Sequence, residues 1–339
     1  MAPRRYNAKI QRAKGLLEIA AAMYDTSLSF ETRRAAERAL QTESRVGYLL
    51  NLALVAAPAQ GAAGVSLSFA ADSFLELYWV AEKKVSLAWV NPSVAATLAY
   101  KGTGPFKRPL PLRAIAVFPS YDVVGFAVHE SLGISSLTEI KERKIPLRLA
   151  TRETGARAVA ESPTMFTVAA VMKAAGFTVA DLRRWGGKIH SVERPSDPRR
   201  RAAIVRGAVD AVFDEGIKSW GQTALDRGFR YLPVEGAVLR RLAAMGYRPS
   251  VVPRAIFHGM KADVQTVDFS GWPMVVHKDM PNDVAYAICE AIAAKRRALP
   301  TDNFKPLNLA QLCADDAEAP RGLPLHPGAA RFYRERGYL

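Results

Sequence analysis

The chain has 339 residues, of which 49% are hydrophobic and 23% are charged, a composition typical of a globular protein with room for two domains. The longest apolar run, at residues 46–59, is too short for a membrane span, and Cys289 and Cys313 stand apart with no neighbouring histidine, so neither a disulfide framework nor a zinc site is expected. The net charge of +15 is divided among pairs and triples of basic residues on several predicted helices, without an aromatic-lined stripe, which argues against a nucleic-acid partner.

The N-terminal part of the chain, residues 1–64, favours helix. Alanine, arginine, glutamate and leucine dominate residues 6–22 and 31–43, so we expect two helical segments that pack on the first lobe described below. An apolar stretch at residues 15–24 contains Glu18, whose charge opposes insertion as an export signal. We therefore expect the mature protein to keep its N-terminus and to stay in the cytoplasm.

From residue 65 onward, predicted strands and helices alternate. Polar residues followed by proline mark helix starts at Asn91-Pro92, Ser162-Pro163 and Asp197-Pro198. The alternation predicts an α/β fold with mostly parallel, doubly wound sheets. The strands are expected at residues 65–70, 85–90, 112–118, 123–128, 147–150, 188–192, 208–213 and 230–234.

These strands are more than one modest sheet holds, so we predict two doubly wound α/β lobes with a hinge. Lobe 1 is expected to comprise residues 65–126 and 266–339, and lobe 2 residues 127–265. The chain crosses between the lobes near residues 123–128 and returns near 266–276. A ligand is expected in the cleft between them.

The loop after the strand at residues 147–150 is the strongest indication of a binding site. It carries Arg152 and Arg157, and Ser162-Pro163 then opens a helix that we expect to reach Ala175. A loop at the carboxyl end of a strand, beside a helix N-terminus, is suited to bind a small anion. The alternative is an ordinary connection between a strand and a helix.

The C-terminal run at residues 323–337, LPLHPGAARFYRERG, resembles the closing signature of the TAXI family, the solute receptors associated with TRAP-type transporters. Three segments further upstream are also similar to that family. They are the central strand and turn at residues 113–122, the entry to the second lobe at 133–137 and a strand at 206–212. The similarity covers the chain from about residue 65 to its end, and it depends on the order and spacing of these motifs.

The resemblance implies the type II periplasmic-binding-protein-like fold, with two α/β lobes hinged by crossing strands. It also implies a small organic acid, such as a dicarboxylate, or an amino acid as the ligand, and subunits of a TRAP-type membrane transporter as partners. The family is periplasmic, so the location stays open between the periplasm, by resemblance, and the cytoplasm, by the N-terminal sequence.

Four loops at strand ends converge if this fold forms, at residues 71–73, 91–93, 151–155 and 214–216. Arg152 offers a planar guanidinium group that matches a carboxylate, or it pairs with Glu153 or Asp214. Asp214 and Glu215 suit a ligand amino group, or an ion pair with Arg152. Tyr121 either closes the pocket with its hydroxyl or is an aromatic residue of a turn.

Helix capping alone also explains the serine and asparagine side chains at these strand ends. The candidate ligand-binding residues are Ser73, Asn91, Ser93, Tyr121, Thr151, Arg152, Thr154, Asp214 and Glu215.

Catalytic motifs are not recognisable in the sequence. It contains no serine elbow, no H-E-x-x-H and no phosphate loop. Asp214 and Glu215 are adjacent on a strand and point to opposite faces, which makes them a poor acid-base couple. We predict a solute-binding protein without cofactor or metal. The alternatives are a cytosolic ligand sensor or accessory subunit, and an enzyme such as a decarboxylase on the same fold.

Overall fold

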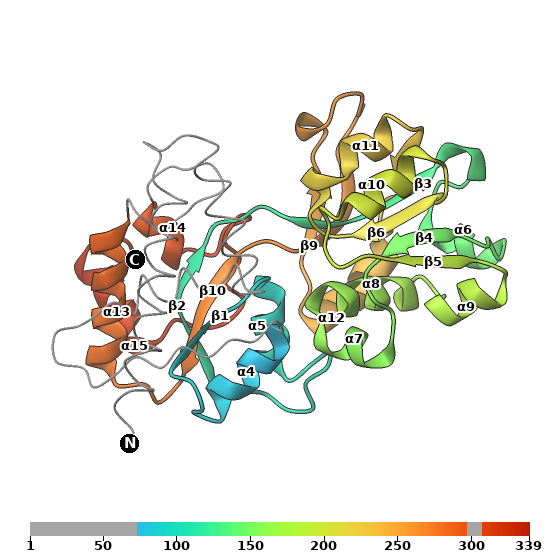
Figure 1. Cartoon of the computed structure of the whole chain (residues 1–339). Helices are drawn as coiled ribbons and strands as arrows, with labels where there is room; N and C mark the ends of the chain where they lie inside the picture. The colour runs from blue at the N-terminus through green and yellow to red at the C-terminus, as the bar shows by residue number, and fades with distance from the viewer. Residues whose placement is uncertain (1–72, 297–306) are drawn as a thin grey trace, which may run out of the picture. The chain divides into compact units, whose positions relative to one another are not determined.

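The computed structural model describes residues 73–296 and 307–339, and these residues form two compact units (Figure 1). Unit 1 comprises residues 73–96, 110–120, 271–296 and 307–339, and unit 2 comprises residues 97–109 and 121–270. The segment predicted to be helical at residues 1–64, the strand predicted at 65–70 and loop residues 71 and 72 lie outside the described residues. Each unit has its own sheet.

A three-stranded sheet forms the centre of unit 1, in the order β1-β10-β2. Strand β10 (Trp272–His277) is antiparallel to both β1 (Leu87–Trp89) and β2 (Leu112–Phe118). The segment before the last helix adds to β2, because the backbone N–H of Ala114 donates to Pro324 (2.9 Å) and that of His326 to Ala114 (2.8 Å). The helices of this unit are α4 (Ser73–Ala81), α13 (Asn282–Lys295), α14 (Leu309–Cys313) and α15 (Pro327–Glu335).

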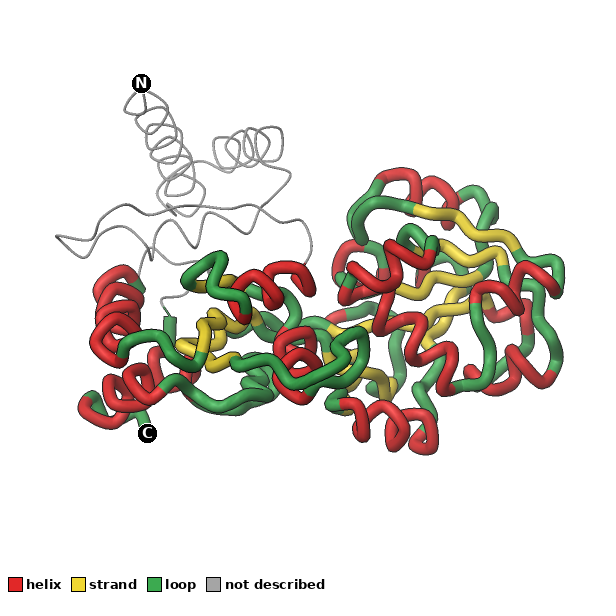
Figure 2. The backbone as a smooth tube through the Cα atoms, turned by 90° about the horizontal axis from the view of Figure 1, so that it is seen from below, coloured by secondary structure: helices red, strands yellow, loops and turns green. Residues whose placement is uncertain are grey.

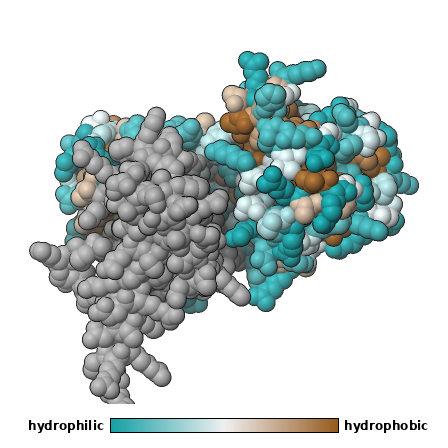
Figure 3. Space-filling model, turned by 45° about the horizontal axis from the view of Figure 1, so that its top comes forward, coloured by the Kyte–Doolittle hydropathy of each residue, from teal (hydrophilic) through white to brown (hydrophobic). Residues whose placement is uncertain are grey.

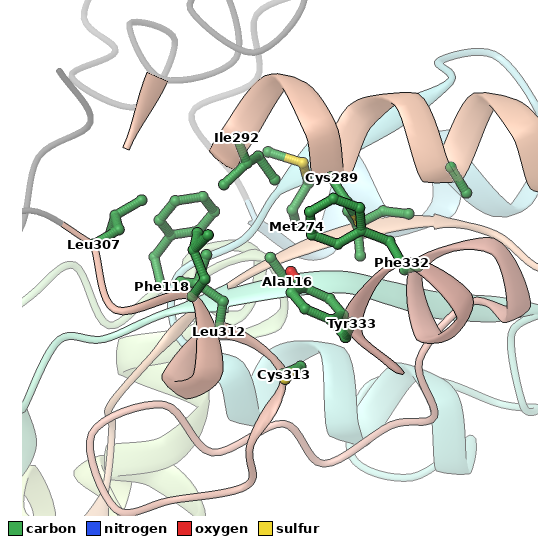
Figure 4. Packing of buried hydrophobic residues seen from close by; sticks show 14 of the residues in the cluster. Ala116, Phe118, Met274, Cys289, Ile292, Leu307, Leu312, Cys313, Phe332 and Tyr333 are labelled. Atoms are coloured by element: carbon green, nitrogen blue, oxygen red, sulfur yellow. The ribbon is translucent and has the colours of Figure 1, made fainter. Parts of the chain in front are cut away.

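A buried apolar cluster joins this sheet to helices α13 and α15 (Figure 4). Phe118 and Met274 enter it from the strands, Cys289 from α13, and Phe332 and Tyr333 from α15. Helix α13 buries residues 285, 289 and 292, a spacing of four and three residues that places them on one helix face. Removal of this apolar surface from water is the main force that holds unit 1 together.

A seven-stranded mixed sheet forms the centre of unit 2, in the order β5-β4-β6-β3-β9-β8, with β7 also paired to β3. Among the described strands, β4 pairs in parallel with β5 and with β6, whereas the other pairs are antiparallel. The strands are β3 (Val123–His129), β4 (Arg148–Thr151), β5 (Lys188–Ser191), β6 (Ala211–Asp214), β7 (Phe229–Tyr231), β8 (Pro249–Val252) and β9 (Val264–Asp268).

Helices cover this sheet, with α8 (Pro163–Ala174) and α12 (Gly236–Met245) on one side and α10 (Pro198–Val205) and α11 (Gly221–Leu225) on the other (Figures 1 and 2).

Ser162 caps α8, as expected, by accepting the N–H of Met165 at 3.3 Å, and Asp197 caps α10. Helix α5 (Ser93–Lys101) begins in unit 1 and ends in unit 2. The other helices are η1 (Glu130–Leu132), α6 (Leu137–Glu142), α7 (Ala156–Glu161), α9 (Val179–Arg184), η2 (Ile217–Ser219) and η3 (Arg254–Ile256).

The predicted α/β class is confirmed, but the expectation of mostly parallel sheets is wrong. Both sheets contain antiparallel pairs, and the described strands of unit 1 pair only in that way. Strand direction depends on which segments pair, and partners such as β2 and β10 lie far apart in the chain. The alternation of strands and helices along the sequence does not indicate which strands pair or in which direction they run.

The visible surface of unit 2 is largely hydrophilic, with scattered apolar residues (Figure 3). The large hydrophobic side chains that are exposed in the described part of the chain occur singly along the sequence, which is normal for a protein surface. None of the helices in residues 73–296 and 307–339 has both the length and the apolar character needed to cross a membrane.

Candidate functional site

One edge of the sheet in unit 2 collects charged side chains. Parallel strands β4 and β6 end at this edge, where Arg152 follows β4 and Asp214 closes β6. Strand β3 is antiparallel to β6, so Asp122, which precedes β3, lies at the same edge, and α10 adds Arg200. We refer to Asp122, Arg152, Arg200, Asp214 and Glu215 as the charged cluster.

Asp214 is the centre of the charged cluster, and its side chain is fully buried. One carboxylate oxygen, Oδ2, accepts hydrogen bonds from Arg152 Nε at 2.7 Å and from Arg200 Nη2, while Oδ1 accepts the backbone N–H of Glu215 at 2.8 Å. Arg200 is also fully buried, and its Nη1 donates to the carbonyl of Pro195 at 3.1 Å. Burial of an unpaired charge costs several kcal/mol, and these ion pairs offset that cost for the buried Asp214 side chain.

Arg152 and Glu215 are the members of the charged cluster whose side chains are partly exposed and form an ion pair with each other. Their side chains pair through Arg152 Nη2, and they are 15% and 16% exposed respectively. Arg152 Nη1 donates to the carbonyl of Glu193 at 2.6 Å. The ion pair with Asp214, which the sequence left open as an alternative for Arg152, is therefore present.

The carboxyl groups of Asp122 and Glu215 are close enough that each changes the pKa of the other. Both carboxylate oxygens of Asp122 accept the backbone N–H of Gly216 at 3.1 Å. Burial raises the pKa of Glu215 well above its usual range, and the negative charges of Asp214 and Asp122 raise it further. Burial raises the pKa of Asp122 to about 6, although the N–H groups of Val123 and Gly216 favour its ionised form.

Asp268, the last residue of β9, pairs in register with Val123 at the same edge and is 6% exposed. Burial raises the pKa of this carboxyl to about 6, against a hydrogen bond from the Ser270 N–H at 3.2 Å. An unfolded aspartate has a pKa of about 4. The folded protein therefore binds this proton more strongly, and the stability it contributes is present below about pH 4 and is lost as the pH rises through about 6.

We expect Asp268→Asn to remove this part of the pH dependence. Urea unfolding at several pH values should show that the wild type loses stability relative to the variant as the pH rises from about 4 to about 6.5. Asp226→Asn changes an exposed aspartate and is the control. If the difference between wild type and Asp268→Asn does not change with pH, the assignment is wrong.

Three other predicted residues of unit 2 have structural partners. Thr151 is completely buried, and its hydroxyl donates to the carbonyl of Phe213 at 2.7 Å, which links β4 to β6. The Thr154 hydroxyl accepts a hydrogen bond from Arg183 Nη2 at 3.0 Å. Tyr121 donates to the carbonyl of Val251, and its ring packs against the apolar residues beneath the sheet. Their roles in binding stay predictions.

The remaining predicted residues, Ser73, Asn91 and Ser93, belong to unit 1. Ser73 is the first residue of α4, and Ser93 is buried at the first position of α5. Asn91 is partly buried in the turn that leads into α5. The structure thus places six of the nine candidates in unit 2, and three of these, Arg152, Asp214 and Glu215, come together in the charged cluster.

Two members of the charged cluster, Arg200 and Asp122, are absent from the sequence-based candidates. Arg200 is the middle residue of the basic triple Arg199-Arg200-Arg201, and it is buried whereas its two neighbours are exposed. The sequence does contain an indication that Arg200 is buried. Positions 200, 203 and 204 share one helix face, and positions 203 and 204 are apolar. Asp122 stood in a predicted turn, and nothing in the local sequence distinguishes it from an ordinary turn aspartate.

Within residues 73–296 and 307–339, no group of three or more histidine, cysteine, aspartate or glutamate side chains is placed to hold a metal ion. The chemistry of the charged cluster is that of guanidinium and carboxyl groups. It can bind an anion through Arg152 and exchange a proton through the Asp122 and Glu215 pair.

A model of the NMT1-like family matches residues 49–337 of the chain. Among solved structures, the alkanesulfonate-binding protein SsuA from Xanthomonas axonopodis pv. citri, bound to MOPS, is 13% identical, with a TM-score of 0.31 over 68% of this chain and 63% of SsuA. The glycine betaine/L-proline-binding protein ProX from Borrelia burgdorferi is 16% identical, with a TM-score of 0.37 over 79% and 81%. PhnD1 from Prochlorococcus marinus, in complex with methylphosphonate, is 12% identical, with a TM-score of 0.34 over 81% and 87%.

Proposed function

The chain belongs to the NMT1-like family, and from this premise we propose that it is a solute-binding protein for a small organic anion, a carboxylic acid or an amino acid. The observation that carries the proposal is the charged cluster, in which Arg152 and Glu215 are partly exposed above the buried Asp214 and Arg200. Burial of so many charged groups is costly, and strongly shifted pKa values concentrate at functional sites.

The Arg152 guanidinium is the group that we propose binds the anion. A guanidinium presents parallel N–H donors whose planar geometry matches a carboxylate, and such charge-assisted bonds are stronger than neutral ones. The bonds from Nε to Asp214 and from Nη1 to the Glu193 carbonyl hold its plane in a defined orientation. A pre-oriented cation of this kind loses little freedom when a ligand binds.

We also propose which class of solute receptor the protein belongs to. The motifs at residues 113–122, 133–137, 206–212 and 323–337 support a TAXI receptor that delivers its ligand to subunits of a TRAP-type membrane transporter. The placement of the ligand in a cleft between two lobes likewise stays a prediction. A pull-down from membranes of the native host, with the protein as bait, tests the transporter partner.

An enzyme is the second candidate, and the Asp122 and Glu215 carboxyl pair is the observation that favours it. Two carboxyl groups with different proton affinities are the usual means of acid-base chemistry. The pair is bound internally by Gly216 N–H and Arg152, which suits a structural role at a binding site equally well. Measurement of decarboxylase turnover on the acids that bind distinguishes an enzyme from a receptor or sensor.

A thermal-shift screen of organic acids and amino acids should first identify a ligand, because a molecule that binds only the folded protein raises its apparent stability. We then expect Arg152→Ala to weaken binding by about 1.5 to 3 kcal/mol, the scale of hydrogen bonds to a charged group. Arg152→Lys should restore only part of the loss, since an ammonium group lacks the planar pair of donors. Calorimetric titration measures both effects.

Arg157→Ala is the matched control for this experiment. Arg157 lies in the following helix, its side chain is 88% exposed and it pairs with Glu161 at 2.7 Å. Its removal should leave the affinity unchanged within about 0.5 kcal/mol. Equal affinities of the wild type and both Arg152 variants would exclude Arg152 from the site.

A further inference from the structure

Arg200 is the fully buried arginine of the charged cluster, and it shares an acceptor with Arg152. The Oδ2 atom of Asp214 accepts N–H groups from both side chains, from Arg152 Nε at 2.7 Å and from Arg200 Nη2. We propose, resting on the function proposed above, that Arg200 is a positioning residue. It holds Asp214 in the orientation in which Asp214 fixes the plane of the Arg152 guanidinium, so the ligand carboxylate pairs with a group that is already oriented.

The Asp214 side chain connects the two arginines directly. Its Oδ1 atom accepts the backbone N–H of Glu215 at 2.8 Å, while Oδ2 accepts the bonds from Arg152 and Arg200. The Asp214 side chain is fully buried, so bulk water cannot replace a bond that is lost. Bonds at both oxygens restrict rotation of the carboxyl group. Removal of Arg200 deletes the bond that holds Oδ2 from the fully buried side of the cluster.

The loop at residues 193–195 is a second connection between the two arginines. Arg152 Nη1 donates to the Glu193 carbonyl at 2.6 Å, and Arg200 Nη1 donates to the Pro195 carbonyl at 3.1 Å. Each arginine thus bonds both to Asp214 and to this loop. Because Arg200 anchors the same carboxyl group and the same loop, it restrains the Arg152 guanidinium at two of its nitrogens, Nε and Nη1.

Helix α10 holds Arg200 in a fixed place. Asp197 caps this helix by accepting the backbone N–H of Arg199 at 2.9 Å, and the backbone N–H of Arg200 donates to the Asp197 carbonyl at 3.0 Å. Ala203 and Ile204 share the helix face of Arg200 and are buried in the apolar cluster of unit 2. The Arg200 side chain therefore extends from an anchored backbone, as support of another side chain requires.

Packing alone does not explain an arginine at position 200. Its Nε atom is buried and has no hydrogen-bond partner among the described residues, and an unsatisfied buried donor is destabilising. Replacement of a buried ion pair by apolar residues of similar volume is often neutral or stabilising. The two Nη atoms of Arg200, in contrast, bond to Asp214 and to the loop that also hold Arg152. This arginine is therefore better explained by what it orients than by the stability it provides.

Nuclear magnetic resonance relaxation of the arginine Nε–H groups tests the positioning without a ligand. We expect an order parameter for Arg152 near that of a rigid backbone, about 0.85, and a value below about 0.6 for Arg157, whose side chain is 88% exposed. In Arg200→Met the Arg152 value should fall towards that of Arg157. In the control Arg201→Met, which changes an exposed residue of the same helix, it should stay high. An Arg152 value that does not respond to Arg200→Met would overturn the proposal.

Arg200→Lys is the second variant, for the case in which Arg200→Met does not fold. Lysine keeps a buried positive charge beside Asp214, but an ammonium group lacks the planar fork that joins Asp214 to the Pro195 carbonyl. The Arg152 order parameter should therefore fall in this variant too. A value equal to that of the wild type would refute the positioning role.

Calorimetric titration with succinate tests the effect on binding. When Arg152 is no longer held, the ligand has to order its side chain, so Arg200→Met should lower the affinity by about two- to tenfold. In the Arg152→Lys background the same substitution should change the affinity by less than about twofold, because an ammonium group has no plane to orient. An equal loss in both backgrounds would show a general effect on the fold and would contradict the positioning role.

The two proposals fail separately. If no carboxylic acid or amino acid binds the wild type, the proposed function is wrong, and the order parameters still decide whether Arg200 orients Arg152. If succinate binds but the order parameter of Arg152 is independent of Arg200, the proposed function stands and the positioning role is wrong.

Discussion

Replacement of Arg200 by methionine is expected to lower the stability of unit 2 by about 3 to 5 kcal/mol, the usual cost of leaving a buried charge without its partner. Arg200 and Asp214 are both completely buried and form an ion pair. Methionine fills a similar volume but donates no hydrogen bond, so Asp214 keeps only Arg152 and the Glu215 N–H as partners. The Pro195 carbonyl also loses its donor.

Two comparisons isolate this effect. Arg201→Met changes an exposed arginine on the same helix and should cost less than about 0.5 kcal/mol. The double variant Arg200→Met with Asp214→Asn should be less destabilised than the sum of the two single variants, because it removes the unpaired charge together with its partner. Urea unfolding measures the stabilities, and a loss for Arg200→Met as small as that for Arg201→Met would contradict the ion-pair assignment.

Phe332→Ala is expected to destabilise unit 1 by about 3 to 5 kcal/mol, as is usual when a large buried aromatic side chain is deleted. Phe332 is 1% exposed, and its ring meets the rings of Tyr286 and Tyr333 edge to face, with centroids 5.4 Å apart in both cases. The substitution removes apolar surface from the cluster between the sheet and helix α15 and leaves a cavity (Figure 4). Arg334→Ala, on the exposed face of the same helix, is the control.

Hydrogen exchange measured by mass spectrometry shows which unit each substitution weakens. Exchange reports the opening of local cooperative units, and the two units have separate cores. Phe332→Ala should accelerate exchange in β2 and β10 and leave β4 and β6 unchanged, and Arg200→Met should do the reverse. Equal acceleration in both units would show that they unfold as one.

Much of the local structure follows from short sequence patterns. The helices that begin after Ser162 and Asp197 start where the cap and proline predict, because capping involves residues within one turn of each other. The strand cores at residues 112–118 and 123–128 are runs of apolar residues, and both are strands in the structure. Helices α7 and α9 and strand β8 were not predicted from the sequence.

The candidate site was predicted in part. Arg152, Asp214 and Glu215 follow or end strands, and strand ends at one edge of a sheet come together in any α/β fold. Arg200 was missed because it stands in a run of three arginines, and only burial distinguishes it from its neighbours. Asp122 was missed because its role depends on the position of Glu215 and Gly216.

The sequence by itself determined the α/β class, the starts of α8 and α10 and the apolar strands at residues 112–118 and 123–128, because these depend on residues that are close in the chain. Only the tertiary structure decided the direction of the strands and the partners of the charged side chains. Arg152 and Asp214 are 62 positions apart, and their ion pair exists because β4 and β6 lie side by side. The shifted pKa of Glu215 has the same origin, since burial and the charges of Asp214 and Asp122 arise only when the sheet has formed.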